Sequence, residues 1–141
     1  MNCTGTAQAR SGVHCVVILC IDDRLQMLDL RKAALESCGY SVKIAASGYA
    51  GLKMLEELPV AAVLLEYKLE GMDAEAVAFQ IRGRFPRLPI ILLSAYAEMP
   101  ERILWLVDEY VMKSAPPGEL VNVIERVTLP THNGGKRWAA A

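Results

Sequence analysis

The sequence lacks a large excess of charge of either sign. It has 15 Lys and Arg residues against 16 Asp and Glu residues, which gives a net charge of −1. No basic surplus is present to attract nucleic acid or an acidic membrane surface, so we expect neither as a partner. The chain has 141 residues, which indicates one domain, and 53% of them are hydrophobic, enough for a well-buried core.

Cysteines are few and are not spaced as metal ligands. They form no CxxC pair and have no histidine at the spacing of a metal ligand, so we expect no zinc site and no disulfide framework. We interpret them as buried free thiols of a protein in the reducing cytoplasm. The four residues are Cys3, Cys15, Cys20 and Cys38.

Long hydrophobic runs are also missing. The longest run near the N-terminus, 15–21, ends at two aspartates and is too short to span a membrane. It has neither the basic segment nor the clear cleavage site of a signal peptide. The sequence therefore predicts a cytoplasmic protein.

Short apolar runs alternate with helical patterns along the chain. Strands are predicted at 13–21, 41–45, 61–66, 90–94 and 110–113. Helices are predicted at 24–38, after a Ser47 cap, after an Asp73 cap, at 100–106 and at 118–127. This alternation is typical of an α/β fold in which a parallel sheet carries helices on both faces. We expect a flexible arm at 1–12, one domain at 13–128 and a tail at 129–141.

Two further expectations concern the core. In the first helix, the 3.6-residue period places four residues on one inward stripe: Leu25, Leu28, Leu35 and Cys38. In the short fourth helix, we interpret Trp105 as a core aromatic.

Polar residues end the predicted strands. Ligands of parallel α/β sheets bind at the carboxyl ends of the strands, where we find Asp22, Asp23, Glu66, Ser94 and Lys113. Three carboxylates gathered there would need a hard cation, and Mg²⁺ suits oxygen ligands. A hydroxyl and an ammonium opposite them would suit an anion such as a phosphoryl group.

Over 16–127 the sequence resembles the receiver domain of bacterial response regulators. The motifs occur in order at receiver-like intervals: Ile21-Asp22-Asp23, Leu65-Glu66-Tyr67, Gly71-Met72-Asp73, Leu93-Ser94-Ala95 and Tyr110-Val111-Met112-Lys113. The resemblance implies a CheY-like, doubly wound, flavodoxin-like fold with five parallel strands in the order 2-1-3-4-5.

The resemblance also implies a role for each site residue. Mg²⁺, which we expect to bind weakly here, would be held by Asp22, Asp23, the acceptor position Glu66 and the backbone carbonyl of Lys68. Ser94 would contact a phosphoryl oxygen, and Lys113 would pair with the acceptor carboxylate. Tyr110 matches the aromatic residue whose rotamer reports the switched state.

Glu66 stands where the family normally has the phosphoacceptor aspartate. Its carboxylate reaches about 1.5 Å further, by ordinary bond lengths. It carries one negative charge, whereas a phosphoryl group carries close to two. Glu66 therefore either imitates the phosphorylated state in part or forms an ion pair with Lys113 that locks an inactive shape. In-line transfer needs close placement of the nucleophile, so at most slow phosphorylation of Glu66 is expected.

Two other departures affect the signalling surface. Ser114 follows Lys113 where many receivers have a proline, so the loop into the last helix is expected to differ. The stretch between Ser94 and Lys113 is a few residues shorter than usual, which predicts a trimmed fourth helix.

These features predict a stand-alone atypical receiver of two-component or phosphorelay signalling. We expect no enzyme activity, a monomer or weak homodimer, and a histidine kinase, phosphotransfer protein or other signalling protein as partner. The alternative is a flavodoxin-like small-molecule-binding domain. Against it, Asp22-Asp23-Arg24 replaces a glycine-rich phosphate loop after the first strand.

Overall fold

The computed structural model describes residues 16–129, and there five strands alternate with five helices. The strands are β1 (Val17–Ile21), β2 (Ser41–Ala45), β3 (Ala62–Glu66), β4 (Ile90–Ser94) and β5 (Glu109–Met112). The helices are α2 (Leu25–Glu36), α3 (Gly48–Glu57), α4 (Ala74–Arg84), α5 (Glu101–Leu106) and α6 (Pro117–Thr128). The predicted arm, and the predicted tail beyond its first residue, lie outside the described residues.

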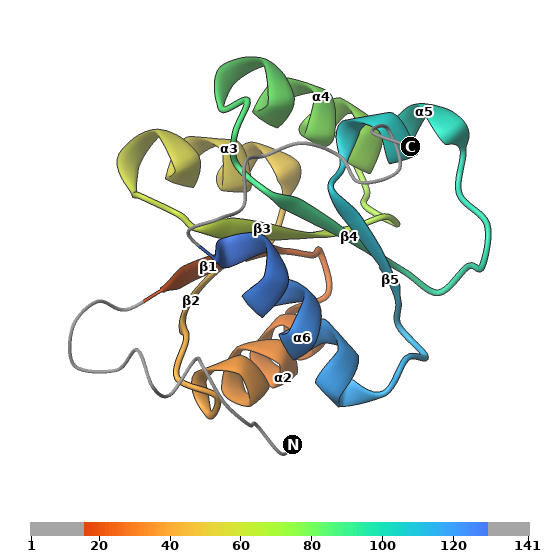
Figure 1. Cartoon of the computed structure of the whole chain (residues 1–141). Helices are drawn as coiled ribbons and strands as arrows, with labels where there is room; N and C mark the ends of the chain where they lie inside the picture. Colours follow the sequence, from red (N-terminus) through yellow and green to blue (C-terminus); the bar gives the residue numbers. More distant parts are fainter. Residues whose placement is uncertain (1–15, 130–141) are drawn as a thin grey trace.

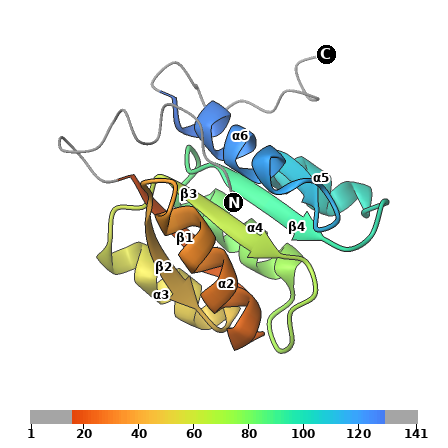
Figure 2. The same ribbon diagram turned by 90° about the horizontal axis from the view of Figure 1, so that it is seen from below.

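The strands form one parallel sheet in the order β2-β1-β3-β4-β5. Helices α3, α4 and α5 cover one face and α2 and α6 cover the other (Figure 1), and the view from below places α2 and α6 in front of the sheet (Figure 2). The predicted α/β, doubly wound, flavodoxin-like fold is therefore confirmed. The strand order reverses between β1 and β3, which makes their carboxyl ends the expected ligand-binding edge.

The core has two layers because both faces of the sheet are covered. Every residue of β3 and β4 is buried, which explains why these strands read as continuous apolar runs. Side chains of α2 and α6, such as Leu28 and Ile124, pack on one face. Side chains of α3, α4 and α5, such as Val77 and Ile103, pack on the other.

Local signals in the sequence mark the helix ends correctly. The Ser47 hydroxyl accepts a hydrogen bond from the amide of Ala50 at 3.1 Å, and the Asp73 carboxylate accepts one from the amide of Ala76 at 2.8 Å. Each bond satisfies an N–H group that the first turn leaves free. The turn before α4 contains Gly71 at φ 78°, a left-handed conformation that favours glycine.

Two predictions about the core are wrong. Leu25 is 61% exposed, because the first turn of α2 begins beyond the carboxyl end of β1 and so extends past the sheet. Trp105 is 51% exposed. In α5 the buried residue is Ile103, and a residue two positions further lies about 200° around the helix. Trp105 therefore faces away from the sheet.

The prediction of free thiols is wrong for Cys38. Cys20 is free and buried, whereas Cys38 is disulfide-bonded. A disulfide joins residues that the fold brings together, so sequence spacing did not reveal it. Burial raises the pKa of the Cys20 thiol to about 12, so this thiol stays protonated at neutral pH.

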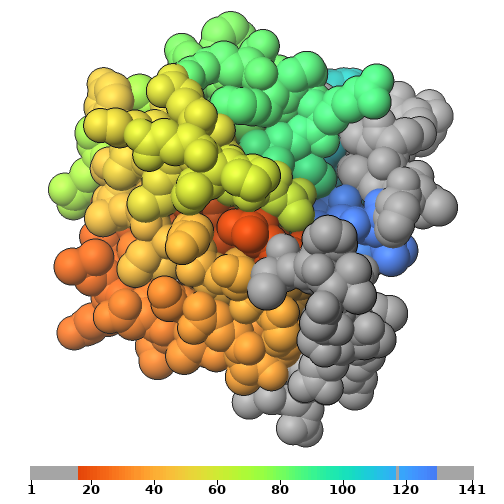
Figure 3. Space-filling model, turned by 90° about the vertical axis from the view of Figure 1, so that its left-hand side faces the viewer, coloured from red at the N-terminus to blue at the C-terminus, as the bar shows by residue number. Residues whose placement is uncertain are grey.

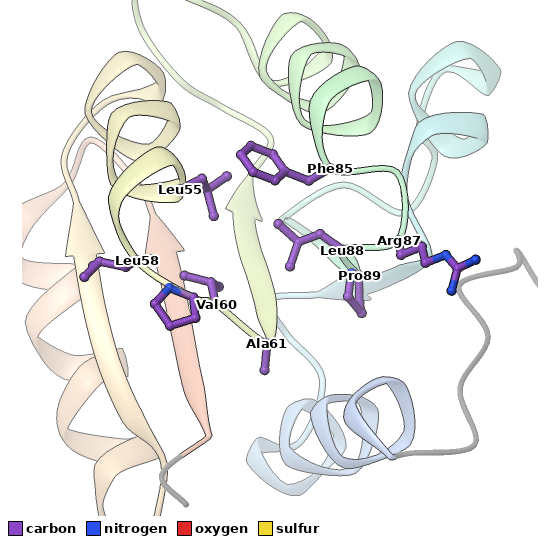
Figure 4. A pocket seen from close by; sticks show the side chains of 9 residues that line it. Leu55, Leu58, Val60, Ala61, Phe85, Arg87, Leu88 and Pro89 are labelled. Atoms are coloured by element: carbon purple, nitrogen blue, oxygen red, sulfur yellow. The ribbon is translucent and has the colours of Figure 1, made fainter.

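A hollow of about 390 Å³ lies at the edge of the sheet where β3 and β4 begin. Figure 3 shows this edge, with α3 in yellow, the segment that leads into β4 in green and the start of β1 in red. Leu55, Phe85 and Leu88 gather around the hollow and Arg87 points away from it (Figure 4). Its lining is largely apolar and comes from the edge opposite to the predicted site. Among residues 16–129, no helix combines the length and hydrophobicity needed to cross a membrane.

Arg82 of α4 ties together the segments that lead into β4 and β5. Its guanidinium donates hydrogen bonds of 2.9–3.1 Å to the carbonyl oxygens of Pro86, Leu88 and Leu106. It also pairs with the carboxylate of Asp108 at 2.7 Å. Asp108 is 2% exposed and accepts a further hydrogen bond from the amide of Ile90 at 2.8 Å. One partly buried guanidinium therefore connects α4 with the end of α5 and with the segments that lead into β4 and β5.

Replacing this arginine should destabilise the fold. In Arg82→Ala, the Asp108 carboxylate stays buried without its cation, and we expect the free energy of unfolding to fall by about 3 kcal/mol. Urea denaturation followed by circular dichroism measures the change. Arg87→Ala is the matched control, because Arg87 is exposed and a change within about 0.5 kcal/mol is expected. Equal losses in the two variants would contradict a structural role for Arg82.

Candidate functional site

The carboxyl edge of the sheet brings most of the predicted site residues together around one hollow. This hollow measures about 480 Å³ and includes Asp23, Glu66, Lys68 and Lys113 in its lining. The residues follow β1, β3 and β5 or end them, so the parallel sheet itself gathers residues that are distant in sequence. Asp22 and Ser94 also stand at this edge, and both are fully buried.

Glu66 is held by two neighbours at the end of β3. The side chain is buried, and its Oε1 atom forms an ion pair with the ammonium of Lys113. Its Oε2 atom accepts a hydrogen bond from the backbone amide of Lys68 at 3.0 Å. Lys113 follows β5, and its own amide donates to the carbonyl of Ser94 at 2.8 Å. Both carboxylate oxygens of Glu66 therefore have a partner within the chain.

Asp22 is bound to a cation that sequence analysis missed. Its Oδ2 atom lies 3.4 Å from a guanidinium nitrogen of Arg31 in α2, and its Oδ1 atom accepts a hydrogen bond from the amide of Arg24 at 3.0 Å. Arg31 stands between the buried residues Leu28 and Leu35 at helical spacing, and its side chain is 11% exposed. A cation on an inward helical stripe was the signal that could have found it.

The carboxylate of Asp23 is bound by the loop that follows β3. Its carboxylate accepts a hydrogen bond from the amide of Glu70 at 2.9 Å. Within residues 16–129, no three side chains of Asp, Glu, His or Cys are grouped closely enough to hold a metal ion. The side-chain geometry therefore does not fit a Mg²⁺ ion held jointly by Asp22, Asp23 and Glu66.

Ser94 and Tyr96 shape the wall formed by the end of β4. The Ser94 hydroxyl accepts a hydrogen bond from the amide of Tyr96 at 3.0 Å, which closes the turn after the strand. The ammonium of Lys68 lies 5.5 Å from the centre of the Tyr96 ring, within the range of a cation–π contact. These contacts join the loops after β3 and β4 beside Glu66.

Tyr110 lies outside this hollow, on the surface formed by α5 and β5. Its hydroxyl is buried, and no hydrogen bond reaches it from the described residues. With Leu104 and Trp105 it lines a third hollow, of about 530 Å³, whose lining also includes Glu101 and Glu109. The predicted switch residue therefore lies beside the exposed tryptophan.

The parallel sheet and the ordered acidic, hydroxyl and ammonium residues at its carboxyl edge define a CheY-like receiver. The family model described as the response regulator receiver domain matches residues 18–125. The chain therefore belongs to the response regulator receiver family, whose members act in two-component signalling.

Curated relatives share the receiver segment but are longer proteins. A response regulator described as NtrX-like, from Rickettsia typhi, is 35% identical over 114 residues, which cover 77% of this chain and 24% of the relative. The transcriptional regulatory protein ZraR of Escherichia coli K12 is 26% identical, with 82% of this chain and 27% of the relative covered. The chain thus spans about a quarter of their length, and its expected stand-alone role stays a prediction.

Solved structures show the same fold. The response regulator TrrA of Thermotoga maritima, in complex with Mg²⁺-BeF, is 31% identical with a TM-score of 0.75, covering 79% of this chain and 98% of that one. A receiver domain from Clostridium thermocellum has a TM-score of 0.74 at 24% identity, covering 80% and 94%. This second match supports the fold alone.

The ion pair of Glu66 makes a prediction about stability. Lys113→Ala leaves a buried carboxylate without its cation, and we expect a loss of about 2 kcal/mol in the free energy of unfolding, less than for a fully buried pair because Lys113 is partly exposed. Adding Glu66→Gln should restore part of the loss, since the uncompensated charge is removed. Lys53→Ala, at an exposed position of α3, is the control. If Lys113→Ala costs no more than the control in urea denaturation, the pair does not stabilise the domain.

Proposed function

We propose that this domain is an atypical receiver that signals through protein contacts, without efficient phosphorylation of its acceptor position. The observation that carries the proposal is the state of Glu66, whose two oxygens are engaged by Lys113 and by the amide of Lys68. On this proposal the domain is an interaction module and not an enzyme.

The geometry around Glu66 supports this reading in two ways. Phosphoryl transfer needs an acceptor oxygen in line with the bond to the leaving group, and the longer side chain of Glu66, held by Lys113 and by the amide of Lys68, places its carboxylate differently from that of an aspartate. In addition, Glu66 forms with Lys113 the ion pair that the acceptor aspartate forms with this lysine in the receiver family. The domain would then either stay permanently in one signalling conformation or change conformation when a partner binds preferentially to another one.

The surface of α5 and β5 is the proposed output face. Trp105 is half exposed there beside Leu104 and Tyr110, and α5 has only six residues. An exposed aromatic beside a hollow is typical of a protein-binding hot spot. The proposed partner is a histidine kinase, phosphotransfer protein or other signalling protein, which the domain meets in the cytoplasm as a monomer or weak homodimer.

Treatment with acetyl phosphate tests the role of Glu66. At a high Mg²⁺ concentration, intact-mass measurement should show no phosphoryl group on the natural protein and one on Glu66→Asp, because aspartate restores the shorter acceptor. A mass increase mapped to Glu66 itself would instead support slow phosphorylation. If neither protein gains mass, Glu66 is not what prevents phosphorylation, and the proposal loses its main support.

Photo-crosslinking in the source organism tests the output face. A photoreactive amino acid in place of Trp105 should capture a two-component signalling protein, identified by mass spectrometry. The same residue in place of Lys43 is the control, because β2 and β5 lie at opposite edges of the sheet and Lys43 is exposed. Capture of the same proteins from both positions, or of none from position 105, would argue against this face.

A further inference from the structure

Each of the three carboxylates predicted at the carboxyl edge has a partner supplied by the chain itself. Glu66 pairs with Lys113, Asp23 accepts the amide of Glu70, and Asp22 pairs with Arg31. Of these three carboxylates, that of Asp22 is the most deeply buried, because it is not exposed at all. A buried carboxylate is unfavourable without a compensating charge, so its cation is a structural requirement.

Arg31 reaches this carboxylate from the core side of α2. Its position between Leu28 and Leu35 places it on the stripe that packs on the sheet, and its side chain is 11% exposed. Both Arg31 and Asp22 lie close enough to the buried Cys20 thiol to act on its pKa, the arginine lowering it and the aspartate raising it. The guanidinium is therefore enclosed beneath the acidic edge and is not a surface group that happens to touch it.

We propose that Arg31 is a built-in cation of the acidic pocket that lowers its affinity for divalent metal ions. A guanidinium is not deprotonated in proteins, so its charge is permanent. A metal ion recruiting Asp22 would be repelled by Arg31, or would have to displace it and leave a charged group beside the apolar contacts of α2. The proposal goes beyond the proposed function, which depends on Glu66 and not on Arg31.

Metal titration of chelator-treated protein tests the proposal. The variant Arg31→Gln keeps polar groups but removes the charge, and Lys32→Gln is the matched control. Lys32 is the next residue in the helix and pairs with Glu36 at the surface, at 3.8 Å. Mg²⁺ is added while the amide resonances of Asp23 and Glu70 are followed by NMR. We expect Arg31→Gln to bind Mg²⁺ at least about tenfold more tightly than the natural protein, and Lys32→Gln to match the natural protein.

Thermal unfolding gives a second readout if Arg31→Gln folds poorly. A ligand that binds only the folded state raises the melting temperature, so Mg²⁺ should stabilise Arg31→Gln more than the natural protein. The proposal is overturned if the natural protein binds Mg²⁺ as tightly as Arg31→Gln, or if both variants gain affinity equally.

A third variant separates this proposal from the one about Glu66. If Glu66→Asp with Arg31 intact binds Mg²⁺ as tightly as Glu66→Asp combined with Arg31→Gln, Arg31 has no influence on the metal. That result would overturn the role of Arg31 and leave the role of Glu66 standing. Tighter Mg²⁺ binding by the combined variant than by Glu66→Asp alone supports Arg31 as the built-in cation.

Discussion

Compensation of buried charge is the constraint on which this structure depends. In β3 and β4, which are buried along their whole length, polar side chains stand only at the strand ends, where they are largely shielded from water. At the carboxyl edge Glu66 meets Lys113 and Asp22 meets Arg31, and at the opposite edge Asp108 meets Arg82. Each pair also connects separate elements, so the charges that must be balanced are the same ones that position the loops.

The chain has the receiver fold, but the side chains at its carboxyl edge are not arranged to share a metal ion. The family model covers residues 18–125, and the sheet has the receiver strand order. Yet no three metal-ligating side chains are grouped together in the described part of the chain, because each carboxylate turns toward a different donor. An arrangement in which Lys113 and Arg31 supply the positive charge internally is consistent with a receiver that does not need an external ion or phosphoryl group to order its loops.

Much of the fold could be predicted from the sequence because its signals are local. The apolar runs that form strands, and the caps at Ser47 and Asp73, depend only on neighbours within one strand or one helical turn. Together they predict the alternation of strands with helices. Strand ends were also predictable, and because the ends of parallel strands share an edge, the positions of Asp23, Glu66 and Lys113 followed. Resemblance to the receiver family supplied the strand order.

The sequence by itself thus determined which residues form each element and which polar residues stand at the carboxyl edge. Only the tertiary structure decided their partners and their exposure: Arg31 beneath Asp22, Arg82 against Asp108, and Trp105 on the surface. The reason is that a charge pair or an exposed aromatic depends on how a helix is rotated and placed on the sheet. A rotation of one residue, about 100°, would turn Arg31 away from Asp22 without changing the sequence pattern that forms α2.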